Sequence, residues 1–125
     1  MNVIEQSRPP ASVIPGVAHS TLACGANGLT ELSVWRQTLS AGAATPPHRH
    51  DCDEVVLCLS GWGEIHTEGR VQRFGPDCTV ALPAHRDHQL FNVGPMPLEI
   101  IGIFAATPVV TRELDGTPLD LPWRS

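Results

Sequence analysis

Glycine and proline interrupt this chain so often that no amphipathic helix of ordinary length fits between them. The sequence has 12 prolines and 11 glycines among its 125 residues, and no window of helical length keeps an apolar repeat of about 3.6 residues. Short β-rich runs recur instead, as expected for strands. We therefore predict an all-β protein with strands at 17–23, 30–39, 47–50, 54–59, 63–68, 71–74, 79–82, 88–92 and 98–104.

Turn-forming residues separate the predicted strands. Pairs such as Ser60-Gly61 and Gly94-Pro95 supply residues that tolerate a positive φ or fix φ in advance. Regular short strands joined by tight turns are typical of a sandwich or a barrel. A chain of 125 residues has room for one ordinary core. We predict a single domain over 1–125, with an N-terminal arm at 1–15 and an extended C-terminal arm at 107–125 packed on the body; a frayed C-terminus is the alternative.

Charge and hydropathy argue against two classes of partner. The formal net charge is −5, whereas a nucleic-acid binder needs a basic surface to displace counterions from phosphates. No stretch approaches the ~18 apolar residues of a membrane span, and the N-terminus lacks the pattern of a secretory signal. We expect a cytoplasmic protein that binds a small molecule and neither nucleic acid nor membrane. The spacing of the four cysteines fits neither a zinc ribbon nor a secreted disulfide framework, so we expect reduced thiols.

Two histidines and a glutamate form the first candidate site. His48 and His50 are two residues apart, so in an extended segment both imidazoles project to the same face. The preceding prolines favour extended geometry. Glu54 then begins an apolar strand, and a carboxylate buried there needs a partner. A metal ion is one such partner; taken alone, the two histidines are equally compatible with a surface loop.

The longer pattern resembles the cupin superfamily. Five residues stand at every position of its first motif: Gly42, His48, His50, Glu54 and Gly61. Three keep the spacing of its second motif: Pro83, His88 and Asn92. The resemblance implies a double-stranded β-helix, also called a jelly-roll barrel. It also implies a divalent metal site whose ligands are His48, His50, Glu54 and His88.

Three positions depart from the second motif. His85 stands where glycine is usual, and because Gly75 lies two residues early, Asp77 and Cys78 occupy the family's glycine and acidic positions. Asp and His tolerate a left-handed backbone better than most residues. His85 lies three residues before His88, so it is a candidate substrate-facing acid or base, with a solvent-exposed turn histidine as the alternative.

One face of the strand at 30–39 is expected to line the pocket. We favour Trp35 and Gln37, because Arg36 on the opposite face is easier to solvate outside. Further candidates for substrate contact or for the apolar wall are Cys58, Phe91, Ile101 and Phe104. Most of these residues are equally compatible with an ordinary core. A thiolate ligand from Cys52 or Cys58 is the less favoured reading, since the motif already supplies four ligands.

The ligand set constrains the chemistry. Three neutral imidazoles and one carboxylate leave a divalent ion with a net charge of about +1, which attracts anionic oxygen ligands. Mixed nitrogen and oxygen donors suit Fe²⁺, Mn²⁺, Ni²⁺, Co²⁺ or Zn²⁺. Our leading hypothesis is an oxygenase, isomerase, cyclase or lyase acting on an oxygen-rich metabolite, with His85 or Glu54 handling protons. A binding module for a sugar or organic acid and a purely structural barrel are the alternatives.

The sequence also argues against two narrower classes of cupin protein. The chain contains no tyrosine, which excludes a cupin thiol dioxygenase that depends on one. No helix-turn-helix segment accompanies the predicted barrel, which argues against a self-contained transcription regulator. The resemblance implies a homodimer, because small cupins usually pair through sheet faces or exchanged terminal strands.

Overall fold

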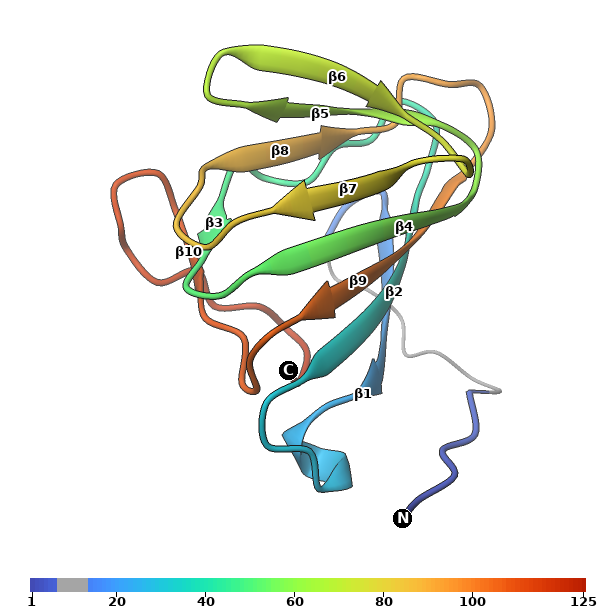
Figure 1. Cartoon of the computed structure of the whole chain (residues 1–125). Helices are drawn as coiled ribbons and strands as arrows, with labels where there is room; N and C mark the ends of the chain where they lie inside the picture. Colours follow the sequence, from blue (N-terminus) through green and yellow to red (C-terminus); the bar gives the residue numbers. More distant parts are fainter. Residues whose placement is uncertain (7–13) are drawn as a thin grey trace.

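The computed structural model describes residues 1–6 and 14–125, and the regular secondary structure in them is almost entirely β-strand (Figure 1). The elements are β1 (Val17–Ala23), η1 (Gly25–Asn27, a 3-10 turn), β2 (Ser33–Leu39), β3 (Arg49–His50), β4 (Glu54–Ser60), β5 (Gly63–Thr67), β6 (Arg70–Phe74), β7 (Thr79–Leu82), β8 (His88–Phe91), β9 (Leu98–Phe104) and β10 (Thr111–Arg112). The all-β prediction is confirmed, and only β10 was not expected. No helix in this part of the chain has the length and apolarity that a membrane span requires.

The strands form two sheets and a short ladder. The larger sheet has the order β1-β2-β9-β4-β7, and the smaller has the order β6-β5-β8. Figure 1 shows the smaller sheet lying across one side of the larger one, with β3 and β10 at one end. Isolated bridges from Ala44 to Phe91 and from His48 to His88 attach the segment leading into β3 to β8. These bridges close the barrel on the side where the histidines lie.

Buried and more exposed residues alternate along β9 and along most of β4. Leu98, Ile100 and Phe104 are buried, whereas the residues between them are partly exposed or glycine. The same period gives β4 a buried face that includes Glu54 and Val56. Because side chains alternate between the two faces of a strand, one face of each strand builds the core and the other faces outward.

Two turns show why the motif positions matter. Gly61 has φ +77°, and a Cβ there would lie 2.5 Å from the carbonyl oxygen of Pro97, so no side chain fits. His85, at the usual glycine position of the second motif, adopts φ +67°. The departure therefore keeps the left-handed backbone that the turn requires, at some conformational cost to a non-glycine residue.

The C-terminal segment returns to the barrel and makes specific contacts with it. β10 pairs with β3, placing Thr111 opposite His50. Arg112 forms a bidentate ion pair with Asp51, with Nη2 to Oδ2 at 2.8 Å and Nε to Oδ1 at 2.9 Å. Near the end of the chain, the hydroxyl of Ser33 donates to the carbonyl of Ser125. The predicted N-terminal arm, 1–15, falls partly outside the described residues.

Candidate metal centre and ligand pocket

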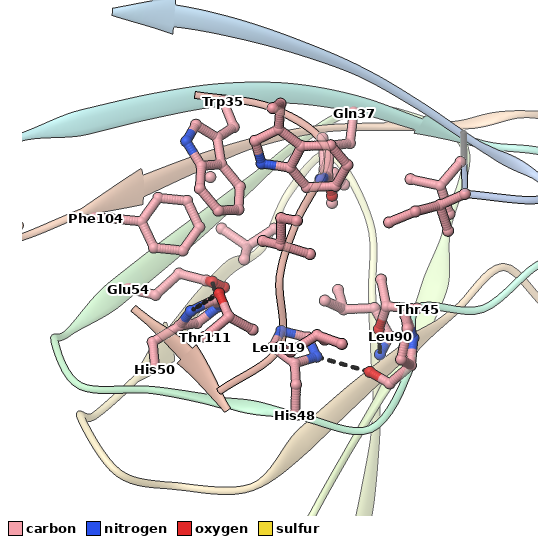
Figure 2. A pocket seen from close by; sticks show the side chains of 18 residues that line it. Trp35, Gln37, Thr45, His48, His50, Glu54, Leu90, Phe104, Thr111 and Leu119 are labelled. Carbon is pink, nitrogen blue, oxygen red and sulfur yellow. Dashed lines mark hydrogen bonds and ion pairs between the residues drawn. The ribbon is translucent and has the colours of Figure 1, made fainter. Parts of the chain in front are cut away.

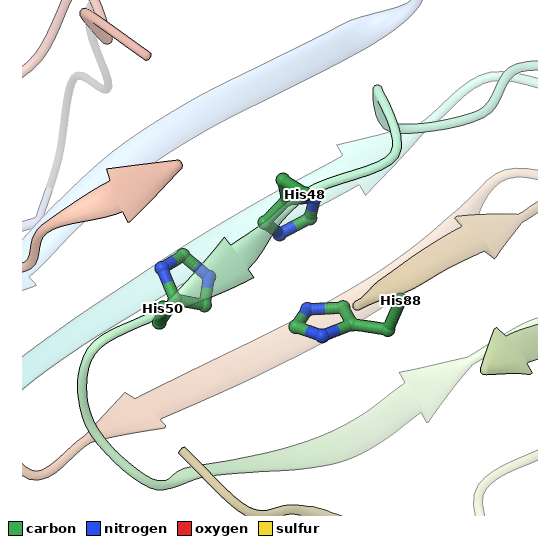
Figure 3. Close-up of side chains that lie close together, drawn as sticks. All are labelled: His48, His50 and His88. Atoms are coloured by element: carbon green, nitrogen blue, oxygen red, sulfur yellow. The ribbon is translucent and has the colours of Figure 1, made fainter. Parts of the chain in front are cut away.

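Three histidines from two neighbouring segments converge at one end of the barrel. His48 and His88 are joined by reciprocal backbone hydrogen bonds, from the N–H of each to the carbonyl of the other, at 3.0 and 2.8 Å. His50 follows on the same face of β3, as the spacing predicts. One ring nitrogen from each of the three lies within 4.8 Å of the others, and Figure 3 shows the imidazoles turned toward a common centre.

Glu54 completes the cluster from the first position of β4. Its Oε2 is 3.7 Å from Nε2 of His50, and its Oε1 is 3.8 Å from Nε2 of His88. These distances are too long for direct hydrogen bonds.

In each imidazole, Nδ1 lies within hydrogen-bonding distance of a neighbouring oxygen atom. Nδ1 of His48 donates to the carbonyl of Pro46 at 2.7 Å, and Nδ1 of His88 donates to the carbonyl of Arg86 at 3.0 Å. Nδ1 of His50 lies 3.0 Å from Oγ1 of Thr111. Carbonyl oxygens only accept, so in His48 and His88 the proton lies on Nδ1 and Nε2 carries the free lone pair. The carbonyl of Val110, 3.4 Å from Nδ1 of His50, favours the same tautomer in the third ring. This arrangement of outer partners is the usual one for metal-binding histidines.

The electrostatics favour a cation at the centre. Burial raises the pKa of Glu54 to about 8 and lowers the pKa of His88 to about 4. Burial also lowers the pKa of His50 to about 3, with further contributions from His48 and His88. The imidazoles are thus neutral, as ligands must be, and the buried carboxylate has no cationic side chain to pair with. Among the described residues, Oε2 of Glu54 and Nε2 of His88 are buried without a hydrogen-bond partner.

A divalent transition-metal ion fits these four residues. It would contact the unpartnered atoms Oε2 of Glu54 and Nε2 of His88, and its charge would stabilise the ionised form of Glu54, which burial alone disfavours. The nitrogen-rich donor set with one carboxylate suits the first-row ions from manganese to zinc and does not choose among them.

An apolar pocket adjoins the histidines. Trp35 and Gln37 of β2 and Phe104 of β9 line it, together with His48, His50 and Glu54 (Figure 2). Its free volume is about 50 Å³, which holds only a few water molecules. The side chains expected to line the pocket from β2 and from the end of β9 are therefore in place.

Two other candidates lie elsewhere, and both corrections have one cause. On β8 the candidate ligand His88 points inward, so Leu90 does too, and Phe91 instead packs on His66 with ring centroids 4.3 Å apart. On β9 the inward Phe104 implies an inward Ile100 and a partly exposed Ile101. Side chains alternate between the two faces of a strand, so one residue known to point inward fixes the orientation of the residues beside it.

Cys58 does point inward but lies deeper than the pocket. Its side chain belongs to the hydrophobic core around Val56 and Ile100 and contacts the carbonyl oxygens of Ser60 and Gly61. It does not line the pocket. Cys58 was expected to contact the substrate, but it lies four residues beyond Glu54 along β4, which places the thiol away from the pocket.

His85 lies outside the pocket. Its backbone N–H donates to the carbonyl of His50 at 2.8 Å, and its side chain is 69% exposed with Nδ1 3.8 Å from Oδ1 of Asp51. The left-handed backbone turns the ring toward solvent. His85 is thus a solvent-exposed turn histidine, which was the alternative interpretation. Its position does not support a role in proton transfer to a ligand in the pocket.

The C-terminal arm supplies the part of the pocket that sequence reasoning missed. Leu119, Leu121 and Trp123 close its outer side. These residues are spaced by two, which is the signal of an extended segment with one apolar face. Nothing in that spacing tells which part of the barrel the face covers.

His19 contacts this arm by ring stacking and is linked to it by hydrogen bonds through Thr21. Its Nδ1 accepts from the amide of Gln37 at 3.0 Å, and its Nε2 donates to Oγ1 of Thr21 at 2.8 Å. Thr21 in turn donates to the carbonyl of Arg124 at 2.6 Å. The ring of Trp123 stacks on His19 with centroids 3.7 Å apart and an interplanar angle of 10°. The chain end is thereby tied to β1 and β2.

Solved structures with similar folds are cupin barrels or enzymes built on them. KdgF from Halomonas sp. has a TM-score of 0.71 with 23% identity, covering 84% of this chain and 93% of that one. The polyketide cyclase RemF from Streptomyces resistomycificus has a TM-score of 0.73 with 16% identity, covering 100% and 84%. A cupin 2 conserved barrel protein from Salinispora arenicola has a TM-score of 0.71 with 16% identity, covering 83% and 87%. The likeness shows that the fold is a cupin barrel.

Sequence comparison is more specific. Auxin-binding protein T92 of Nicotiana tabacum is 32% identical over 106 residues, which are 75% of this chain and 57% of that protein. Auxin-binding protein 1 of Arabidopsis thaliana is 31% identical over 105 residues, which are 76% and 53% of the two chains. The chain thus spans a little over half the length of these curated relatives. Residues 3–112 match the auxin binding protein family profile, and by this match the chain belongs to that family of cupin barrels.

Proposed function

We propose that this protein is a metal-dependent binding protein for a small organic acid with an apolar body. One observation carries the proposal: the three-histidine cluster of His48, His50 and His88, with Glu54 beside it, adjoins a pocket whose other walls are mainly apolar. A pocket of this kind offers two different ends, one for a charged group and one for a hydrocarbon or aromatic body.

The metal end selects a carboxylate. With three neutral imidazoles and one carboxylate, a bound divalent ion keeps a net charge of about +1 and supplies a Lewis-acidic centre for oxygen ligands. Among the described residues that line the pocket, no lysine or arginine competes with the metal for that group.

The apolar end selects the body of the acid. Trp35, Phe104 and Trp123 present aromatic rings, and Leu121 lies with them. The indole N–H groups of Trp35 and Trp123 are buried without a hydrogen-bond partner among the described residues. A flat ligand with a polar edge suits such a wall, because it gains ring contacts and gives an unpaired donor an acceptor.

Binding requires the arm to move. A free volume of about 50 Å³ is well below that of ordinary ligand sites, which are roughly 300–1,000 Å³. Leu119, Leu121 and Trp123 belong to the final segment and are partly exposed. They are the side chains that can shift at least cost to the core.

Calorimetric titration tests the proposal. The curated relatives are named auxin-binding proteins, so the auxin indole-3-acetate is the first probe, with acetate and neutral indole as partial ligands. We expect indole-3-acetate to bind the zinc- or manganese-loaded protein at least tenfold more tightly than either. Binding should vanish after chelation and in His88→Ala, and persist in His66→Ala, which removes a histidine outside the site. Equal binding with and without metal would overturn the proposal.

A metal-dependent enzyme is the second candidate, as an oxygenase, isomerase, cyclase or lyase. The observation in its favour is Glu54, whose Oε2 has no hydrogen-bond partner and whose pKa burial raises to about 8, within range for proton transfer. Similar barrels include RemF and a salicylate 1,2-dioxygenase from Pseudoaminobacter salicylatoxidans. Against it, the described residues that line the pocket include no acidic or basic side chain apart from the candidate ligands. Oxygen uptake or product formation from a bound acid would favour this candidate.

We also propose that the protein forms a homodimer through the outer face of the larger sheet. On β4, Leu57 and Leu59 point away from the core and are 37% and 46% exposed. Val55 lies opposite Ile103, and Leu57 lies opposite Ile101, so the outward residues of β4 and β9 form one apolar surface. A contiguous apolar face of this kind is typical of a protein contact.

A further inference from the structure

Two cysteines at the far end of β4 and β7 form a thiol pair outside the metal site. We propose that Cys58 and Cys78 are a redox-sensitive modification site, which a small-molecule disulfide oxidises to a disulfide bond between neighbouring strands. The described cysteines are free thiols in this structure.

The strand register places the two residues opposite each other. β4 and β7 are antiparallel, with Val56 opposite Val80 and Leu57 opposite Thr79. One further step brings Cys58 opposite Cys78. The N–H of Cys78 donates to the carbonyl of Gly75 at 2.9 Å, so the hydrogen-bonded ladder ends at this position. Directly opposed residues of antiparallel strands have Cα atoms about 4.5–5.5 Å apart, within the range of roughly 4.4–6.8 Å that disulfides need.

Both side chains point to the same face. Cys58 alternates with the buried Val56 and is itself 7% exposed, and Cys78 alternates with the buried Val80. Cys78 packs against the hydrophobic core to which Cys58 belongs. Directly opposed residues on one face bring their Cβ atoms close together, so rotation of the two side chains is enough to join them.

The present partners of the thiols are weak. Sγ of Cys58 lies 3.4 Å from the carbonyl oxygen of Ser60, and Sγ of Cys78 lies 3.4 Å from Oδ1 of Asp77. Burial raises the pKa of Cys58, and the nearby Cys78 and Asp77 raise it further. Cys78 is the more accessible of the two. It is therefore the thiol that an external disulfide meets first.

The reaction is a two-step thiol–disulfide exchange. The thiolate of Cys78 attacks one sulfur of the small disulfide RSSR, forming a mixed disulfide and releasing RS⁻, which takes up the proton lost from Cys78. The thiolate of Cys58 then attacks the sulfur of Cys78, releasing the second RS⁻, which takes up the proton lost from Cys58. The protein loses two electrons and two protons, and RSSR is reduced to two RSH.

The bond would connect two strands that lead to the metal site. At their other end, Glu54 lies opposite Leu82, and the chain leaving β7 runs to His88. A link between Cys58 and Cys78 closes the intervening loop, which contains the β5–β6 hairpin. Restricting that loop in the unfolded state stabilises the fold, and we expect the midpoint of thermal unfolding to rise by roughly 5–10 °C.

Oxidation of the full chain tests the proposal. The metal-free protein is incubated with oxidised glutathione at mildly alkaline pH, without denaturant, and analysed by intact mass and peptide mapping. We expect a loss of two hydrogen atoms, a peptide that links residue 58 to residue 78, and a higher unfolding midpoint that dithiothreitol reverses. Cys58→Ser and Cys78→Ser should each abolish the link, whereas Cys24→Ser should retain it.

Three outcomes would overturn the proposal. These are a stable glutathione adduct with no internal link, a link between other cysteines or between two chains, and a cross-link whose formation leaves the unfolding midpoint unchanged. The wild-type protein carries the decisive measurements, so poor folding of a serine variant does not obscure the result.

Discussion

Thr111 lies opposite His50 in the β3–β10 ladder, with its Oγ1 3.0 Å from Nδ1 of the imidazole. In the tautomer that a metal ligand needs, Nδ1 donates its proton to this hydroxyl and Nε2 is free for a metal ion. A two-stranded ladder near the C-terminal arm therefore decides the orientation of a candidate ligand. The carbonyl of Val110 lies 3.4 Å from the same nitrogen and is a weaker acceptor.

Thr111→Val should weaken metal binding because it removes this acceptor while keeping the shape of the side chain. We expect a loss in affinity of roughly 10- to 100-fold, typical of outer partners of metal ligands. Competition with a chromophoric chelator measures it. Thr111→Ser restores the hydroxyl and should retain most of the affinity; an equal loss in both variants would show that packing, not the hydrogen bond, is responsible.

Trp123→Ala should separate the pocket from the metal centre. The indole lines the pocket and stacks on His19, and it is not one of the candidate ligands. We expect the affinity for indole-3-acetate to fall at least tenfold, since a buried aromatic wall is lost, while metal content by elemental analysis stays unchanged. Val110→Ala, on an exposed side chain nearby, should change neither quantity.

Gly102→Ala should destabilise the barrel at the pocket wall. A Cβ at this position would lie 2.9 Å from Cε2 of Phe104, whereas Gly75 offers ordinary contacts from 3.6 Å outward. Crowding of this kind costs about 1–3 kcal/mol in the free energy of unfolding. Urea denaturation measures the difference, and Gly75→Ala is the matched control with little expected effect. A Gly102→Ala variant as stable as the wild type would show that the ring of Phe104 yields freely.

Protonation of His19 should destabilise the protein in acid. Burial lowers the pKa of His19 to about 4 from an ordinary value of 6.5. Because the folded state binds the proton less readily than the unfolded state, the stabilising effect is fully present above pH 6.5. It is lost as the pH falls toward and through 4. The ring is already engaged by Gln37 and Thr21, so a second ring proton would oppose the amide donor.

Thermal unfolding of metal-free protein between pH 7 and pH 4 checks this. The unfolding midpoint of His19→Gln should fall less over this range than that of the wild type, since one titrating group is gone. Identical pH dependence in both proteins would assign the acid sensitivity to the other buried histidines alone.

Leu57→Glu should disrupt the proposed dimer. A charge in the apolar outer face of β4 opposes its burial against a second copy, and sedimentation velocity should show a monomer with an unchanged circular dichroism spectrum. Val71→Glu, an exposed apolar residue on the smaller sheet, is the control and should remain dimeric. A wild-type protein that is monomeric at micromolar concentration would exclude the dimer.

The sequence by itself determined the short strands and the shared face of two candidate ligands. Glycine and proline allow only short elements, and His48 and His50 share a face because residues two apart in a strand do. The choice of Glu54 and His88 as further ligands came from the resemblance to the cupin motifs. Local backbone chemistry also accounts for His85, because its left-handed φ is a conformation that glycine normally supplies at that point. These features require no knowledge of distant contacts.

Only the tertiary structure decided what surrounds the ligands. Ile101 and Phe91 were expected at the pocket, but Ile100 and Leu90 occupy those positions, because one inward residue sets the parity of the whole strand. The arm that closes the pocket is held by a hydrogen bond between residues 103 positions apart, from Thr21 to Arg124. Hydrophobic packing is non-directional, so the pattern of the arm shows that its apolar face is buried, and only the folded barrel shows against which surface.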